Sequence, residues 1–144
     1  MTQSIPTQPV SEITSYHAHV YFRDSAEREV AGWIRERVAE RFLVQMGRWH
    51  DRLVGPHTSP MYQIAFTIDL FPRLVPWLML NRRGLSVLVH PNTDNPHDDH
   101  LVHALWLGPI LAVDGSGLPR SLRATGAEIE IITPNTRPGV ATTP

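Results

Sequence analysis

The 144-residue sequence contains no cysteine and no lysine. The absence of cysteine excludes disulfides, thiolate nucleophiles, iron–sulfur clusters and cysteine-ligated zinc. The absence of lysine excludes Schiff-base chemistry and a P-loop, and all 13 basic residues are arginine. A formal net charge of −1 offers no basic field for a nucleic acid, and no apolar run is long enough to cross a bilayer. We therefore expect a cytoplasmic protein that binds neither nucleic acid nor membrane.

Hydrophobic residues make up 42% of the chain and charged residues 19%, which is typical of a globular domain with a sizeable core. Residues 1–14 and 134–144 are polar, rich in proline and without hydrophobic periodicity. They are predicted to form a flexible N-terminal arm and a flexible tail. Residues 15–133 are then expected to fold as a single domain.

Alternating and helical hydrophobic patterns follow one another along this domain. Alternation predicts strands at residues 15–22, 61–68 and 85–90, and a short strand is predicted at 47–53. Asp24 and Glu27 resemble a capping box, so one helix should run from Asp24 to about Gln45. A second helix is predicted over 73–83, with Gly84 after its end. Residues 99–107 should form a short helix or turn, and 109–113 and 128–132 could each be a strand.

The order strand, helix, strand, strand, helix, strand is typical of the α+β, ferredoxin-like fold. We expect an antiparallel sheet in the order 4-1-3-2, with helices on one face and with strands 1 and 3 parallel at its centre. The other face would be uncovered in one chain. Packing two such faces together predicts a homodimer, a dimeric α+β barrel, that closes the site from water.

Histidine, which can bind metals and transfer protons, occurs 8 times in the sequence. His17 begins the first strand, His90 ends the fourth, and His57 directly precedes the third. The expected topology brings these three to one edge of the uncovered face, with His19 further along it. His100 and His103 could fold back over the fourth strand, whereas His50 and His97 are read as surface residues.

Several imidazoles in one place favour a divalent metal site. Spacing alone does not choose between zinc and non-haem iron. Asp98 and Asp99 are possible carboxylate ligands, although solvation in a loop is the simpler interpretation of both.

Four sequence blocks add a resemblance to this pattern. They are SYHAHVYF at 15–22, GPH at 55–57 followed by Met61, HPNT at 90–93, and DH at 99–100 with HALWLG at 103–108. In this order they resemble the DOPA 4,5-dioxygenase family over about residues 15–110. The chain departs from the family pattern in Thr58 and in its extension after Gly108.

The resemblance implies a small ferredoxin-like domain, commonly dimeric, with a histidine-rich site for Fe(II), although zinc could occupy it in a purified sample. The implied activity is an extradiol dioxygenase that cleaves a catechol such as L-DOPA with O2. The metal would acidify the catechol hydroxyls, and a histidine outside the ligand set would transfer protons.

On this interpretation His17, His57 and His90 are the expected metal ligands. His19 is the expected acid/base residue, with His103 second, and His100 and Tyr21 are further catalytic candidates. Arg48, Arg82 or Arg83 could hold a substrate carboxylate, although a solvated surface position is the simpler interpretation of each. Trp49 and Trp106 are expected in the core or an interface.

Two other functions stay open on the same histidines. One is a zinc hydrolase, which would not consume O2. The other is a non-enzymatic, metal-binding ferredoxin-like dimer. Replacing His19 distinguishes the two classes, because an enzyme should then lose turnover but retain its metal. An RNA-binding module is disfavoured because the strands lack the aromatic pattern of such domains.

Overall fold

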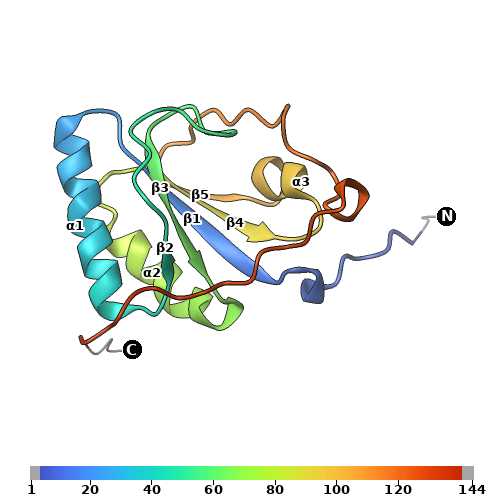
Figure 1. Ribbon diagram of the computed structural model, residues 1–144, viewed down its shortest axis with the longest axis horizontal. Coiled ribbons are helices and arrows are strands. Elements are labelled where there is room, and N and C mark those ends of the chain that lie inside the picture. The colour runs from blue at the N-terminus through green and yellow to red at the C-terminus, as the bar shows by residue number, and fades with distance from the viewer. Residues whose placement is uncertain (1–3, 141–144) are drawn as a thin grey trace.

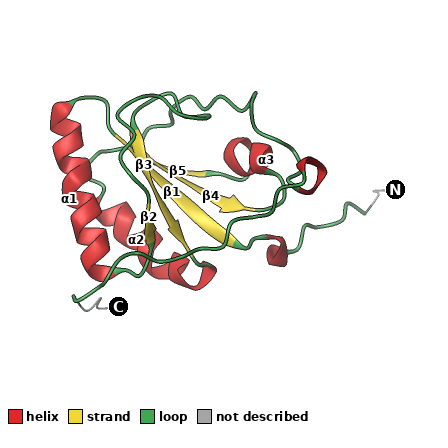
Figure 2. Cartoon of the chain, in the orientation of Figure 1, coloured by secondary structure: helices red, strands yellow, loops and turns green. Residues whose placement is uncertain are grey.

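The computed structural model describes residues 4–140. One antiparallel sheet of five strands is layered against two long helices (Figures 1 and 2). The strands are β1 (Ser15–Tyr21), β2 (Gln45–Met46), β3 (Met61–Phe66), β4 (Val87–Asn92) and β5 (Leu105–Leu107), and the helices are α1 (Ser25–Arg41), α2 (Phe71–Asn81) and α3 (Pro96–Leu101). Short 3-10 turns lie at Val10–Glu12, Ile68–Leu70 and Arg123–Thr125. The fold is α+β, as predicted.

The sheet order is β2-β3-β1-β4-β5, which is consistent with a ferredoxin-like arrangement extended by β5. β1 lies at the centre and pairs antiparallel with both β3 and β4. The prediction that strands 1 and 3 are parallel is therefore wrong. β3 turns back after β2 and inserts between β2 and β1, so it runs opposite to both.

Helix α1 begins where the sequence predicts it. The Asp24 side chain accepts a hydrogen bond from the Glu27 backbone N–H at 2.8 Å, and the Glu27 carboxylate accepts one from the Arg23 N–H at 2.9 Å. These bonds satisfy N–H groups that the helix itself leaves without partners. The helix ends at Arg41, shorter than predicted, because the chain becomes extended at Phe42.

Helices α1 and α2 cover one face of the sheet, and the main core lies between these helices and the sheet. Alternate β1 residues, Ala18 and Val20, point into this core and are fully buried. Ile34 and Val38 of α1 and Leu74 and Leu78 of α2 meet them from the other side. Helix α2 has Pro72 in its first turn, where a missing N–H costs little, and Pro76 inside the helix, where the ring removes one backbone hydrogen bond.

The shorter predicted strands differ most from the structure. The strand predicted at 47–53 is wrong: pairing is confined to Gln45–Met46, with one further bridge from His50 to Met61. Neither 109–113 nor 128–132 forms a strand; Val113 makes only an isolated bridge to His57. Alternation in short segments does not reveal whether a partner strand is within reach.

The second face of the sheet is covered by the chain itself. Helix α3 packs on β4, and Tyr21, Met61 and Leu88 form a small apolar cluster with Trp106 and Val113 against it. The placement of all helices on one face is therefore wrong for α3. An uncovered face no longer argues for a dimer, and the homodimer stays a prediction.

The predicted arm and tail lie only partly within the described residues. Residues 1–3 and 141–144 fall outside them. Of the remainder, Val10–Glu12 forms a 3-10 turn, and Asn135 and Thr136 hydrogen-bond to Val44 and Met46. In the part of the chain that is described, none of the helices has the length and apolarity needed to span a membrane.

A buried histidine cluster as candidate metal centre

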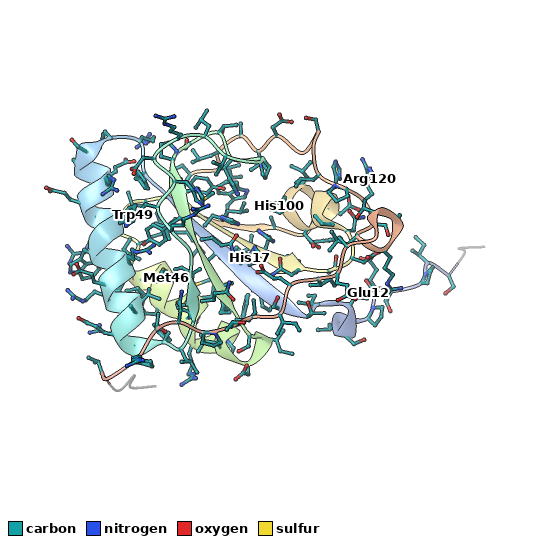
Figure 3. All side chains as sticks on the ribbon, viewed as in Figure 1. Glu12, His17, Met46, Trp49, His100 and Arg120 are labelled. Atoms are coloured by element: carbon teal, nitrogen blue, oxygen red, sulfur yellow. The ribbon has the colours of Figure 1, made fainter. Side chains whose placement is uncertain are left out.

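Five histidines from separate parts of the chain meet on the second face of the sheet. They are His17 and His19 of β1, His57 of the loop before β3, His90 of β4 and His100 of α3. The ring centroids of His90 and His100 are 3.9 Å apart, and those of His19 and His57 are 4.2 Å apart. Figure 3 shows His17 and His100 over the same part of the sheet. These contacts confirm that the histidines meet on one face of the sheet, although not at the single edge that was predicted.

The route by which His57 reaches the cluster differs from the prediction. Because β3 is antiparallel to β1, its start at Met61 pairs with Tyr21, at the far end of β1 from His17. The placement of His57 at the same edge as His17 is therefore wrong. His19, two residues beyond His17 on the same face, lies between the two ends and contacts both sides.

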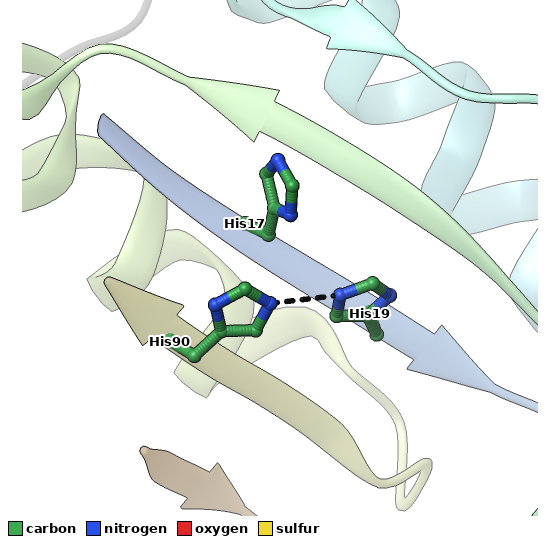
Figure 4. Close-up of side chains that lie close together, drawn as sticks. All are labelled: His17, His19 and His90. Carbon is green, nitrogen blue, oxygen red and sulfur yellow. Dashed lines mark hydrogen bonds between the residues drawn. The ribbon is translucent and has the colours of Figure 1, made fainter. Parts of the chain in front are cut away.

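Among the described residues, two sets of three histidines bring possible ligand atoms within 4.8 Å of one another. One set is His17, His19 and His90, and the other is His19, His57 and His100. Figure 4 shows the first set, with two members on β1 and one on β4. His19 belongs to both sets. The combination expected from the sequence, His17 with His57 and His90, is split between them.

Backbone carbonyls fix the protonation of two rings. His90 Nδ1 lies 2.8 Å from the Pro91 carbonyl oxygen, and His100 Nδ1 lies 2.7 Å from that of Pro96. A carbonyl only accepts, so each Nδ1 must carry the hydrogen and donate it. Nε2 of both rings is then unprotonated, which is the state that a metal ligand requires.

His19 completes the centre of the cluster. Its Nε2 lies 3.1 Å from Nε2 of His90, while its Nδ1 is buried without a hydrogen-bond partner among the described residues. The Nε2–Nε2 distance is close to the separation of about 3.0 Å expected for two ligands at right angles around a metal 2.1 Å away. The same distance also suits a hydrogen bond between the two rings.

His17 is held by a residue far along the chain. Its Nε2 lies 2.5 Å from Oε1 of Glu130, across 113 positions of sequence. Glu130 itself is in neither set of possible ligands. The hydrogen bond to His17 lowers the pKa of Glu130 despite partial burial, so the carboxylate is charged at neutral pH.

Tyr21 and His57 form the other polar pair of the site. The Tyr21 hydroxyl lies 2.7 Å from His57 Nδ1. Burial raises the pKa of Tyr21, so the phenol stays protonated. Burial, and then the charges of His100, His17 and His50, lower the pKa of His57 to about 4.

The same causes act on the remaining buried rings. Burial first, and then neighbouring imidazoles, lower the pKa of His19 and His90 well below the usual value, although the Pro91 carbonyl opposes this for His90. Burial also lowers the pKa of His100. Neutral imidazoles of these three histidines and of His57 at pH 7 leave lone pairs available and repel no cation.

Hydrogen bonds of Asp99 explain how two of the sequence blocks are held together at the site. The buried Asp99 carboxylate accepts hydrogen bonds from the Thr93 backbone N–H at 2.8 Å and from its hydroxyl at 2.7 Å. This ties the HPNT segment to the start of α3 and so places His100 over His90. Asp99 is thus a structural anchor, and Asp98 pairs with His97 instead of reaching the cluster.

Other predicted candidates lie away from the five histidines. His103 is exposed, and Arg48 is exposed on the loop after β2. Arg82 donates to the Leu85 carbonyl, and the Arg83 guanidinium lies 3.9 Å from the ring centroid of Trp33. Both arginines thus contact parts of the chain other than the five histidines.

The two tryptophans behave as packing residues. Trp49 contacts Phe22 and Tyr62 edge to face, and Trp106 stacks on Tyr21. His50 is half-buried and pairs through its backbone with Met61. His97 is half-buried as well, so neither of these histidines is fully on the surface.

A small cavity opens beside the cluster. Its volume is about 190 Å³, and its lining includes His17, His90 and His100 together with Leu122 and Glu130. A larger cavity of about 860 Å³ lies under the N-terminal arm, next to Phe71 and Val89, and includes only His103 among its lining histidines. The smaller cavity is therefore the one that is lined by histidines of the cluster.

An antiparallel sheet that carries five packed imidazoles defines an α+β protein with a candidate metal centre. The family comparison agrees, because the model of the Dopa 4,5-dioxygenase family matches residues 16–116. The chain belongs to the Dopa 4,5-dioxygenase family.

Curated relatives share this region. A DOPA 4,5-dioxygenase from Amanita muscaria is 32% identical over 117 residues, which cover 76% of this chain and 51% of the relative. An uncharacterized 21.2 kDa protein from Botryotinia fuckeliana is 31% identical over 117 residues, or 74% of this chain and 64% of that protein. The chain thus spans between half and two thirds of the length of these relatives.

A solved structure supports the fold as well. A crystal structure described as a "putative dioxygenase" from Nostoc punctiforme is 51% identical, with a TM-score of 0.74, and the match covers 76% of this chain and 94% of that chain. Membership of a dioxygenase family is therefore established for this chain, and its histidine cluster has a geometry that could hold a metal ion.

Glu130 is the site residue that sequence reasoning missed. It lies in the extension beyond the family match and in a segment interpreted as a possible strand. A single glutamate in an alternating stretch carries no signal that would link it to a histidine 113 positions away.

Proposed function

We propose that the protein is a non-haem Fe(II) dioxygenase that opens the ring of a catechol by extradiol cleavage. The observation that carries the proposal is the His19–His90 pair, whose Nε2 atoms lie 3.1 Å apart on a buried face beside a cavity. Two curated or solved relatives that bear a dioxygenase name support it.

The residues present fit a metal ion. We assign His17, His19 and His90 as its ligands, which retains two of the residues expected from the sequence and replaces His57 by His19. His90 is oriented by the Pro91 carbonyl and His17 by Glu130, as outer hydrogen-bond partners orient the imidazoles of metal sites. The two neutral rings of His57 and His100 remain outside this ligand set.

When bound, Fe(II) would acidify the catechol hydroxyls and orient the substrate with O2. The chain supplies proton transfer through His57, which packs against His19 and is neutral at pH 7. The Tyr21 hydroxyl can donate to or accept from His57 Nδ1. The pair therefore stays hydrogen-bonded whether the imidazole carries one proton or two, and Nε2 is the atom that exchanges the proton.

The cavity favours a small substrate. Its volume of about 190 Å³ is below the range of about 300–1,000 Å³ that is usual for drug-sized ligands. A single aromatic ring with a short side chain, as in L-DOPA, is the size class that suits it. Low polarity around Leu122 and Ile129 matches the ring rather than its hydroxyls.

The test is oxygen consumption by the metal-loaded protein. The purified chain is reconstituted anaerobically with Fe(II), mixed with L-DOPA, dopamine or catechol in air, and followed by O2 uptake and visible absorbance. Stoichiometric uptake with a new yellow product is expected. His57→Gln should keep the metal and lose most of the turnover, by about 10²–10⁴-fold for a missing acid/base group.

Two results would contradict the proposal. If the metal-loaded protein consumes no O2 with any of these catechols, it does not cleave their rings. Hydrolytic activity with Zn²⁺ under anaerobic conditions would favour the zinc hydrolase instead, since hydrolysis needs no oxygen.

A further inference from the structure

The C-terminal extension passes directly over the histidine cluster. Figure 1 shows this segment crossing in front of the sheet between α3 and the C-terminus. Before the crossing, Asp94 accepts hydrogen bonds from the Leu122 and Arg123 N–H groups. After it, the Thr133 N–H donates to Gln45 Oε1, and Asn135 bonds to Met46 through both of its amide atoms.

The segment between these anchors forms one wall of the site. Leu122, Ile129 and Glu130 line the cavity of about 190 Å³ together with His17 and His90. The family match ends at residue 116, so this wall is not part of the region that defines the family.

Within this segment, Glu130 contacts a histidine of the cluster and determines which of its ring nitrogens carries a hydrogen. Its carboxylate bonds to His17 Nε2, and a carboxylate at neutral pH can only accept a hydrogen bond. His17 Nε2 must therefore carry a hydrogen, and in the neutral imidazole Nδ1 keeps its lone pair. The His17 side chain is 14% exposed and that of Glu130 42%, so the carboxylate keeps its contact with water on its outer side.

The geometry distinguishes an orienting role from a ligating one. Glu130 is absent from both sets of possible ligand atoms, although it touches a member of one set. Figure 4 shows one ring nitrogen of His17 directed away from the His19–His90 pair, with the other ring nitrogen on the side of that pair. A carboxylate behind a metal-bound imidazole fixes its tautomer and makes it a stronger ligand.

We propose that Glu130 is a positioning residue of the metal centre, which holds His17 by Nε2 so that Nδ1 faces the ion, and that residues 122–133 are a functional wall of the site. This inference rests on the proposed metal site. The extension thereby supplies an outer partner that the matched region, residues 16–116, does not contain.

Cobalt(II) titration of the metal-free protein tests the proposal without any turnover. The visible absorption of bound Co(II) gives a dissociation constant for wild type, Glu130→Ala, Glu130→Gln and the control Glu128→Gln, which changes an exposed glutamate two positions away. Glu130→Ala should bind about 10–100-fold more weakly, as expected for a lost outer partner. Glu130→Gln, which keeps an acceptor oxygen, should lose less, and Glu128→Gln should match wild type.

The tautomer of His17 gives a second readout that a merely structural role would not change. Long-range proton–nitrogen NMR spectra of the metal-free chain should show His17 protonated at Nε2 in wild type and a mixture of both tautomers in Glu130→Ala. Equal Co(II) affinity in wild type and Glu130→Ala, or an unchanged His17 tautomer, would overturn the inference alone. No Co(II) binding by wild type would overturn the proposed metal site and this inference with it.

Discussion

The buried histidines should make the metal-free protein lose stability as the pH falls from 7 to 5. In the unfolded chain a histidine titrates near 6.5, whereas burial and neighbouring charges lower the pKa of His57 to about 4 in the folded chain. Between these values the unfolded state binds more protons, so the free energy of unfolding decreases as the pH falls. The contribution is fully present above pH 6.5.

The magnitude follows from the difference in pKa. For His57 alone the loss between pH 7 and pH 5 is about 2 kcal/mol. His19 and His90, whose pKa values are lowered in the same direction, add to it. This is a large part of the total of about 5–15 kcal/mol for a typical domain. Carboxylates with lowered pKa values titrate mainly below this window.

Urea unfolding followed by tryptophan fluorescence, with the metal removed by a chelator, measures this loss at several pH values. His57→Gln should show a smaller pH dependence, by about 2 kcal/mol over the same interval. Wild-type protein whose free energy of unfolding stays constant from pH 7 to pH 5 would show that the buried histidines do not have lowered pKa values in the folded chain. A His57→Gln variant with the same pH dependence as wild type would show the same for His57.

Three further substitutions test the structural anchors by urea unfolding at pH 7. Asp99→Asn removes the acceptor for the Thr93 N–H and hydroxyl in a buried position and should cost about 1–3 kcal/mol; an unchanged midpoint would contradict its anchoring role. Asp24→Ala removes the cap of α1 and should cost about 1 kcal/mol, whereas Ser25→Ala beside it should be nearly neutral. Leu74→Ala opens a cavity under α2 and should cost about 2–5 kcal/mol, a value that a loss below 1 kcal/mol would contradict.

The long elements were predictable because their patterns are set by burial on one face. Residues of β1 alternate between the helix side and the histidine side, and the Asp24 cap marks the start of α1. The meeting of His17 and His90 could also be expected, since both lie on one face of neighbouring strands and pair directly.

The remaining features depend on contacts between distant segments. The direction of β3 follows from its insertion between β1 and β2, and the hydrophobic pattern is identical for either direction. The C-terminal extension covers the histidine face of the sheet. Its sequence has no hydrophobic periodicity that would predict where the extension lies. The link between Glu130 and His17 therefore could not be derived from spacing.

The iron content of histidine variants shows whether the cluster is the metal centre. Wild type, His19→Leu and the control His97→Ala are loaded anaerobically with excess Fe(II), desalted and measured by elemental analysis, with circular dichroism to confirm that each is folded. His19 belongs to both sets of possible ligands, while His97 belongs to neither. We predict about one iron per chain in wild type and His97→Ala and almost none in His19→Leu. Equal iron in folded His19→Leu and wild type would contradict the histidine cluster as the metal centre.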